Sequence, residues 1–311
     1  MRHSSPPIMV SVSLITYNHK NFIVKALESV LKQKVDFNYE IIIGDDCSSD
    51  GTREILKEYK QKYPEIIQLI LHPQRYKEIP GRTNNITNLY SCKGKYIAML
   101  DGDDYWVSKD KLQKQVDFLE NNPSFSLSFH NAINFSEEKK FKSYLQSEKH
   151  TVLATKSIYN QEFIASGLSI MPASSLVFRN KINGELPEWF REISSADYAL
   201  TLIITSHGDA KFFKDIYSVY RRNQHNFSSK YREIFGQFNS QWKQILILEK
   251  QFKNLDFSKR KAITCYSYSS VLATQKSYLK MFYYMFQAIR YDKRKTKNYL
   301  NYFSNSFIKP K

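Results

Sequence analysis

Cysteine, glycine and proline are scarce in this sequence: its 311 residues include three cysteines, nine glycines and nine prolines. Three cysteines cannot build a disulfide framework, so we expect reduced thiols in a cytoplasmic protein. So few glycines and prolines exclude collagen-like and low-complexity architectures. Hydrophobic residues make up 42% and charged residues 24%, as in ordinary globular proteins. The length predicts about two domains with a substantial core.

Long hydrophobic runs are also missing. The most apolar stretches, such as residues 41–44 and 281–286, are far shorter than the roughly 20 residues of a membrane-spanning helix. Residues 1–7 are polar and lack the apolar centre of a signal peptide. We therefore expect a protein that is free in the cytoplasm or peripheral on the inner face of the cell membrane.

Negative charge is in short supply towards the end of the chain. Residues 231–311 carry 16 Lys and Arg against 4 Asp and Glu, a charge of +12 that leaves only +4 for residues 1–230. A basic tail on a nearly balanced body predicts an anionic partner, either a membrane surface or nucleic acid. The alternative is a solvated helical face that keeps the protein soluble.

The first third of the chain alternates short β-branched runs with helical patterns. This alternation predicts an α/β fold, with a mostly parallel, doubly wound sheet flanked by helices. Asn18 and Asn21 are expected to cap the first helix. After residue 229 the pattern becomes helical, which predicts a helical C-terminal extension. The expected strands are Val10–Thr16 and residues 40–44, 66–71 and 95–100.

Polar residues follow three of these strands, at the edge of the sheet where ligands of such folds bind. One group, Asp101-Gly102-Asp103-Asp104, is called the acidic turn below. Its three carboxylates repel one another unless a cation is present, and their oxygens suit Mg²⁺ or Mn²⁺. The alternative is an acidic surface turn without metal. The other two groups are Thr16-Tyr17-Asn18 and Asp45-Asp46.

The roles of the second and third groups are open on residue chemistry alone. One of Asp45 and Asp46 is expected to form a turn or cap, and the other to accept a hydrogen bond from a base or ribose. Tyr17 offers an aromatic face for stacking a base, or packs as a rim residue on the sheet. No glycine-rich phosphate loop follows the first strand, which argues against dinucleotide dehydrogenases and P-loop enzymes. Any diphosphate must therefore be held by metal and side chains.

Several segments together resemble the family 2 glycosyltransferases, which have the GT-A fold. The resemblance covers roughly residues 8–228, in the family's order and spacing. It implies transfer of a sugar from a nucleotide-diphosphate sugar, a UDP-sugar first of all, to a hydroxyl, usually with inversion and with Mn²⁺ or Mg²⁺. The matching segments are VSVSLITYN (10–18), IIIGDDCSSDGT (41–52), GKYIAMLDGDDYW (94–106), KLQKQVDFL (111–119), ASSLVFR (173–179), ADYAL (196–200) and YSVYRR (217–222).

The resemblance also implies roles for individual residues. In the acidic turn, Asp103 is the expected metal ligand, and Asp101 or Asp104 contacts ribose or metal. His225 is a further candidate metal ligand, two residues beyond the position where many relatives have histidine and this sequence has Asn223. The expected nucleotide-sugar-binding residues are Thr16, Tyr17, Asn18, Asp45, Asp46, Asp101, Gly102, Asp103, Arg221 and Arg222.

Asp197 stands where the family has its catalytic base, although the preceding residue, often acidic in relatives, is Ala196 here. An acceptor hydroxyl must lose its proton as it attacks, and one carboxylate opposite the leaving diphosphate can remove it. No second carboxylate at hydrolase spacing is needed. The alternative is that Asp197 only caps the helix that follows. Arg221 and Arg222 are expected to meet the diphosphate, or else form a basic surface pair.

These observations predict three regions: a nucleotide-sugar-binding half (1–130), an acceptor-binding and catalytic half (131–229) and a basic helical region (230–311). Aromatics beside lysines in the last region are typical of an interfacial membrane anchor, which fits a lipid-linked saccharide acceptor as well as a plain saccharide. Packing as core or as a homodimer contact is the alternative.

The function expected is therefore a metal-dependent inverting glycosyltransferase of bacterial surface polysaccharide or glycoconjugate synthesis, without a nucleic-acid partner. A nucleic-acid-binding or membrane-surface-binding protein with an inert α/β body is the alternative. A metal-dependent phosphoryl transferase or nuclease is a third possibility, but it needs a two-metal residue set that we do not find in the sequence.

Overall fold

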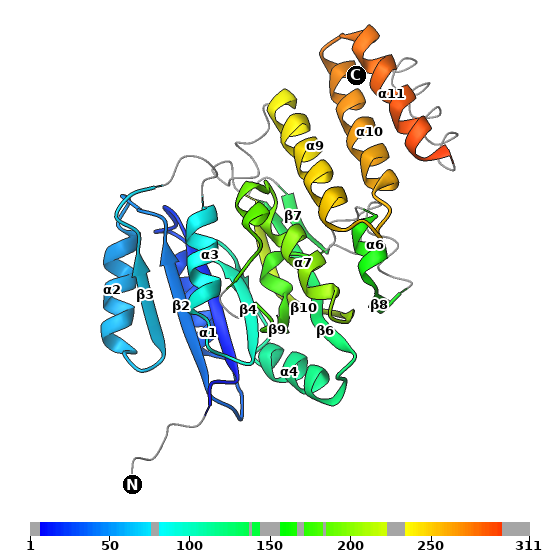
Figure 1. Ribbon diagram of the computed structural model, residues 1–311. Helices are drawn as coiled ribbons and strands as arrows, with labels where there is room; N and C mark the ends of the chain where they lie inside the picture. Colours follow the sequence, from blue (N-terminus) through cyan, green and yellow to red (C-terminus); the bar gives the residue numbers. More distant parts are fainter. Residues whose placement is uncertain are drawn as a thin grey trace. The chain divides into compact units, whose positions relative to one another are not determined.

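The computed structural model describes residues 7–75, 81–136, 139–143, 156–166, 171–182, 185–222 and 234–293 (Figure 1). The chain divides into two compact units. The sheet unit comprises Met1–Gln161, Ile170–Glu192 and Ala196–Asn223, and the helical unit comprises Glu162–Ser169, Ile193–Ser195 and Gln224–Lys311. The boundaries predicted at residues 130 and 229 stay predictions.

The sheet unit contains one mixed sheet with the strand order β3-β2-β1-β4-β9-β6-β10-β5, while β7 pairs with β6 and β8 with β10 (Figure 1). The first four strands in this order are parallel, and β6 is parallel to β10. The bounds are β1 Val10–Thr16, β2 Tyr39–Asp45, β3 Ile67–Leu71, β4 Tyr96–Asp101, β5 Tyr105–Trp106, β6 Phe125–Ser136, β7 Lys139–Ser143, β8 Ile158–Tyr159, β9 Val177–Arg179 and β10 Asp209–Arg222.

Helices connect these strands, as the alternating sequence pattern predicted, and three longer helices make up most of the described helical unit. The predicted α/β class and the helical C-terminal extension are thus confirmed. The bounds are α1 Ile23–Leu31, α2 Thr52–Lys62, α3 Arg82–Ser91, α4 Lys111–Asn121, α6 Gln161–Ala165, η3 Ala173–Ser175, η4 Glu188–Glu192, α7 Ala196–Thr205, α9 Ile234–Gln251, α10 Ser258–Thr274 and α11 Tyr278–Tyr291.

The two faces of β1 meet different helices because side chains alternate along a strand. Val10, Val12 and Leu14 are fully buried in one core cluster with the apolar face of α1. On the other face, Asn88 of α3 donates from Nδ2 to the carbonyl oxygens of Leu14 and Ile42, at 2.9 and 3.0 Å. These bonds tie α3 to β1 and β2, and so hold the strand ends in place.

The expected cap of α1 is wrong. Its N-cap position is Phe22, and Asn18 has a φ of 53° outside the helix. Asn18 Oδ1 instead accepts a hydrogen bond from the backbone nitrogen of Ser49 at 2.9 Å. This hydrogen bond links the loop after β1 to the loop after β2. Asparagine suits the position because its short amide side chain tolerates the left-handed backbone conformation.

Three aromatic-rich helices form the core of the helical unit. Phe238 of α9 stacks on Tyr268 of α10 with ring centroids 4.5 Å apart, and Tyr284 of α11 meets both rings edge-on. Met281 and Ala288 complete the buried cluster from α11. None of the helices in the described ranges is both long and apolar enough to cross a membrane.

Candidate active site

The carboxyl ends of three neighbouring strands bring the predicted polar groups together. The strand register pairs Thr16 of β1 with Asp45 of β2, and Ile15 with Asp101 of β4. The loops that follow these strands therefore emerge side by side, as expected for a parallel sheet.

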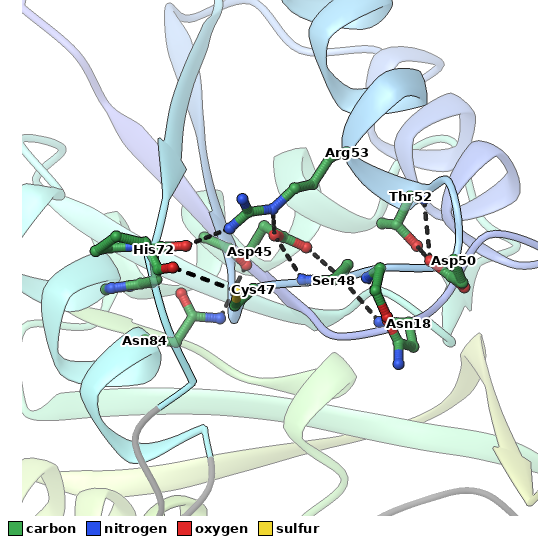
Figure 2. Close-up of polar contacts among 12 residues, drawn as sticks. Asn18, Asp45, Cys47, Ser48, Asp50, Thr52, Arg53, His72 and Asn84 are labelled. Atoms are coloured by element: carbon green, nitrogen blue, oxygen red, sulfur yellow. Dashed lines mark hydrogen bonds and ion pairs between the residues drawn. The ribbon is translucent and has the colours of Figure 1, made fainter.

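The carboxylate of Asp45 stabilises the turn that follows β2 by accepting hydrogen bonds from it (Figure 2). Its carboxylate accepts hydrogen bonds from the backbone nitrogen of Ser48 at 3.0 Å, from the Ser48 hydroxyl and from Arg53 Nε at 2.6 Å. Arg53 also donates to the carbonyl oxygen of His72. Of the two roles left open for the aspartate pair, Asp45 thus takes the turn role, and its part in donor binding stays a prediction.

Asp46 is buried, and an arginine that the sequence did not point to contacts both Asp46 and Tyr17. Arg75 Nε lies 3.3 Å from Asp46 Oδ2, and its guanidinium carbon lies 3.7 Å from the centroid of the Tyr17 ring. Burial raises the pKa of Asp46, while Arg75 opposes that rise. The group offers an aromatic face, a carboxylate and a cation, which together can stack and hydrogen-bond a nucleobase.

The acidic turn is packed closely against the end of β1. A Cβ on Gly102 would lie 2.8 Å from the Thr16 side chain and 3.0 Å from His19 Nδ1, so only glycine fits there. His19 Nε2 lies 3.9 Å from Asp103 Oδ2, and burial lowers the pKa of His19. Thr16 Oγ1 and His19 Nδ1 are buried without a hydrogen-bond partner in the part of the chain that the structure describes. Sequence reasoning missed His19.

Negative charge is concentrated in this turn. Burial, together with the like charges of Asp103 and Asp197, raises the pKa of Asp101 to about 7. Burial and the neighbouring carboxylates also raise the pKa of Asp104. Asp104 Oδ1 accepts a hydrogen bond from the backbone nitrogen of Arg221 at 2.9 Å, whereas Oδ2 is buried without a partner among the described residues.

A divalent cation fits this arrangement electrostatically, because it relieves the repulsion and gives the carboxylate oxygens a partner. Within the described ranges, however, no three His, Cys, Asp or Glu side chains are grouped closely enough to hold a metal by themselves. His225 lies outside those ranges. The residues therefore fit a metal site with few protein ligands. Mg²⁺ sites are often of this kind, because substrate phosphates and water provide the remaining ligands.

Arg221 is partly buried next to the acidic turn. Its Nη1 donates to the Asp103 carbonyl oxygen at 2.7 Å, and its guanidinium carbon lies 4.7 Å from the Tyr105 ring centroid and 5.0 Å from that of Phe22. Burial lowers the pKa of Arg221. This contact fixes one cation beside the acidic turn, and the expected contact of Arg221 with a diphosphate stays a prediction. For Arg222 the structure describes only the backbone, at the end of β10.

Asp197 lies in the first turn of α7, in the same unit as the acidic turn. Its charge contributes to the raised pKa of Asp101, so the two groups interact electrostatically. Asp197 also interacts with Arg82, the first residue of α3, which is buried with its guanidinium carbon 5.1 Å from the Phe190 ring centroid. Burial lowers the pKa of Arg82 to about 10. Sequence reasoning missed Arg82.

Within the helical unit, a glutamine of α9 anchors the short segment Ile193–Ser195, which precedes α7 along the chain. Gln244 Oε1, on α9, accepts hydrogen bonds from Ser194 Oγ at 2.5 Å and from the Ser195 backbone nitrogen at 2.9 Å. Gln244 is buried, and its Nε2 has no hydrogen-bond partner in the ranges described here. Ser195 precedes Asp197 by two residues, so this anchor adjoins the predicted base along the chain.

The sequence model of the family described as "Glycosyl transferase family 2" matches residues 11–186, more than half of the chain. The chain belongs to this family. The family assignment confirms the resemblance found in the sequence, and with it the predicted class of enzyme.

Relatives of this family 2 glycosyltransferase include WfgD of Escherichia coli, named UDP-Glc:alpha-D-GlcNAc-diphosphoundecaprenol beta-1,3-glucosyltransferase. WfgD is 30% identical over 236 residues, which cover 74% of this chain and 84% of WfgD. An uncharacterised Mycobacterium tuberculosis protein is 28% identical over 218 residues, covering 70% of this chain. The aligned region spans 59% of that mycobacterial protein's length.

Two solved structures share the fold. Staphylococcus aureus TarS in complex with UDP has a TM-score of 0.53 and 16% identity, with 94% of this chain and 92% of that chain covered. Mannosyltransferase PcManGT from Pyrobaculum calidifontis, in complex with GDP-Man and Mn²⁺, has a TM-score of 0.56 and 16% identity, with 93% and 88% covered. The fold that this chain shares with these two proteins agrees with the predicted fold class.

Proposed function

We propose that this chain transfers a sugar from a nucleotide-diphosphate sugar to an acceptor hydroxyl, with inversion and with Asp197 as the general base. The observation that carries the proposal is the position of Asp197 in the first turn of α7, in the same unit as the acidic turn and close enough for its charge to raise the pKa of Asp101. A base and a diphosphate-binding turn must both face the sugar that is transferred. In-line displacement then needs one carboxylate on the acceptor side and charge stabilisation on the leaving-group side.

The donor's nucleoside is proposed to bind at Thr16, Tyr17, Asp46 and Arg75. Tyr17 or the Arg75 guanidinium stacks the base, and the buried Asp46 carboxylate accepts one of its hydrogen bonds. A UDP-sugar is the first candidate, since WfgD is named for UDP-Glc and TarS was solved with UDP and UDP-GlcNAc. A GDP-sugar is the alternative donor, since PcManGT was solved with GDP-Man.

Asp103 and Asp101 are proposed to hold Mn²⁺ or Mg²⁺, with Asp104 and His225 as the other candidates. The cation, when bound, neutralises charge on the departing diphosphate. The protein's own residues do the rest: Arg221 adds a fixed cation beside the turn, and Gly102 lets the backbone approach β1 closely. The Mn²⁺ in the PcManGT complex supports a divalent metal and leaves the choice of metal open.

Arg82 is proposed to offset the negative charge that Asp197 and the acidic turn bring together. It is buried, and it interacts electrostatically with Asp197. A cation in this position stabilises a site that otherwise holds several carboxylates near one another. Asp197 is then available to take the proton from the acceptor hydroxyl as it attacks the anomeric carbon.

A saccharide on a lipid carrier is the proposed acceptor, and surface polysaccharide synthesis the proposed process. WfgD is named for a diphosphoundecaprenol acceptor, and a Bacillus subtilis relative, 39% identical over 111 residues, is named a putative teichuronic acid biosynthesis glycosyltransferase. The basic helical region is proposed to contact an anionic membrane, with a homodimer as the alternative. The expectation that the protein binds no nucleic acid stays a prediction.

The test combines donor binding with transfer. Asp197→Asn is expected to lower the transfer rate about 10²- to 10⁴-fold, as for loss of a general base, and to leave the nucleotide-induced thermal shift unchanged. Asp215→Asn, at an exposed carboxylate of the same unit, is the matched control. Near-normal transfer by Asp197→Asn contradicts the assignment of the base.

The metal is tested separately. Asp103→Asn is expected to abolish the extra thermal stabilisation that Mn²⁺ adds to nucleotide binding. Equal nucleotide affinity with and without Mn²⁺, in both the unchanged chain and the variant, contradicts the metal assignment.

A further inference from the structure

Helix α11 has two apolar faces, and among the described residues of the helical unit only one of these faces is buried by neighbouring helices. Met281 and Ala288 are buried against α9 and α10, together with one side of Tyr284. The opposite face exposes residues at i, i+3, i+4 and i+7 spacing, which lie in one row on a helix. Their exposed fractions are 90% for Leu279, 45% for Phe282, 58% for Tyr283 and 63% for Phe286. We call these four residues the α11 face.

An apolar row of this length is unusual on a surface that meets only water. Single exposed apolar residues are common in soluble proteins, but contiguous large ones mark an interaction site. Here three aromatics and a leucine follow one another over two turns of one helix. The α11 face therefore needs a partner.

The exposed charges along α11 and at its two ends, residues 276–293, are all positive. Lys276, Lys280, Arg290 and Lys293 are exposed along the helix or just beyond its ends. Residues 276–291 contain no Asp or Glu, and Asp292 is buried. An apolar face flanked by cations complements a surface that has an anionic outer layer above an apolar interior.

These charges disfavour the two other occupants. In a symmetric dimer, two copies of the α11 face would bring their lysines and arginines together, and like charges repel. Residues 294–311 of the same chain carry five Lys and Arg and no Asp or Glu, so that segment also lacks the complementary charge. An anionic lipid bilayer has both features: its headgroups carry negative charge, and its acyl chains are apolar.

We propose that the α11 face docks on an anionic membrane surface, with Leu279, Phe282, Tyr283 and Phe286 in the interfacial layer and the four cations at the lipid headgroups. The helix lies in the plane of the membrane, in keeping with the finding that no described helix can span it. The docking deepens the proposed use of a lipid-linked acceptor and rests on that proposal for its purpose. The binding itself involves neither donor nor acceptor.

The experiment is a vesicle flotation assay with the full chain and without substrates. The probes are vesicles of mixed phosphatidylglycerol and phosphatidylcholine, compared with phosphatidylcholine alone. Binding is expected only to the anionic vesicles, and it should weaken as the salt concentration rises. The paired variant Leu279→Ser/Phe286→Ser is expected to bind at least tenfold more weakly, because it removes the two most exposed apolar side chains.

A second variant separates charge from apolar contact. Lys276→Gln/Lys280→Gln is expected to lower affinity about fivefold for each cation removed. Leu246→Ser, at a residue of α9 that is 49% exposed, is the matched control and should bind normally. Since all of these positions are exposed, thermal melting should show that the variants stay folded.

Three outcomes overturn the proposal. The first is binding that the α11 variants leave unchanged, including binding lost only when residues 294–311 are removed. The second is no binding to anionic vesicles. The third is a dimer in light scattering that Leu279→Ser/Phe286→Ser converts to a monomer. Because transfer to a soluble acceptor should be unaffected by the α11 variants, failure of the docking and failure of the proposed transferase activity are distinguishable.

Discussion

Replacing Gln244 with methionine is expected to slow sugar transfer much more than it destabilises the fold. Gln244 Oε1 accepts two hydrogen bonds from the segment just before α7, one from the Ser194 hydroxyl and one from the Ser195 backbone nitrogen. Methionine fills a similar volume and accepts neither bond effectively. The helix that carries Asp197 then loses a fixed point two residues from this proposed base.

The expected change in stability is small because two effects oppose each other. Losing two neutral hydrogen bonds costs about 1 kcal/mol each. Methionine also removes the buried Gln244 Nε2 group, which has no partner among the described residues and whose burial costs about 1–3 kcal/mol. The net change in the free energy of unfolding is therefore expected to lie within about 1 kcal/mol of zero, a shift in melting temperature of only a few degrees.

The transfer rate responds differently because catalysis depends on geometry. A displacement of about 1 Å in a catalytic group can cost on the order of 10²-fold in rate. We expect kcat for Gln244→Met to fall about 10- to 100-fold. The KM for the donor, which is proposed to bind at the acidic turn and Tyr17, should stay near its original value. Gln244→Glu keeps an oxygen that can accept both hydrogen bonds, and it should retain more activity than the methionine variant.

The assay measures initial rates at varied donor and acceptor concentrations, next to urea unfolding of the same proteins. Gln251→Met, at an exposed position of the same helix, is the control and should change neither quantity. A full rate for Gln244→Met refutes the reasoning. So does a drop in rate that only follows a loss of folded protein.

Two further predictions concern the sheet unit. Asn88→Leu removes the amide that donates to the carbonyl oxygens of Leu14 and Ile42, so urea unfolding should show a loss of about 1–3 kcal/mol, and an unchanged midpoint contradicts the anchoring role. Burial lowers the pKa of His130 well below the ordinary 6.5, and the positive charge of Lys111 contributes. In the folded protein His130 therefore stays neutral, whereas in the unfolded chain it takes up a proton once the pH falls below about 6.5. Stability should fall by about 2 kcal/mol between about pH 7 and pH 5 through this group, and His130→Phe should lack that part of the loss.

Residue types and order alone were enough to place the strands and helices of the first third of the chain. Runs such as VSVSLIT and EIIIG alternate with amphipathic helical patterns, and the strands begin and end within a residue or so of the predicted bounds. The polar residues after those strands could be predicted to meet, because parallel strands end at one edge of the sheet. The acidic turn and Asp45-Asp46 were found in this way.

The residues that sequence reasoning missed lie in places with no local signal. Arg75 follows β3 in a loop, Arg82 begins α3, and Gln244 comes from α9, nearly fifty residues after Asp197. Single polar residues in loops and helices are ordinary in any sequence. Only folding shows that Arg75 lies on Tyr17 or that Arg82 is buried near a carboxylate.

The basic helical region shows most clearly what the sequence determines and what only the tertiary structure determines. Its sequence determined that the region is helical, aromatic and positively charged, which fitted a membrane anchor, a packed core and a subunit contact equally. Only the tertiary structure decided which residues do what, because packing on α9 and α10 buries Met281 and Ala288 and leaves Leu279 and Phe286 exposed. Burial depends on which neighbours a helix meets, and that is a property of the folded chain rather than of the helix's own sequence.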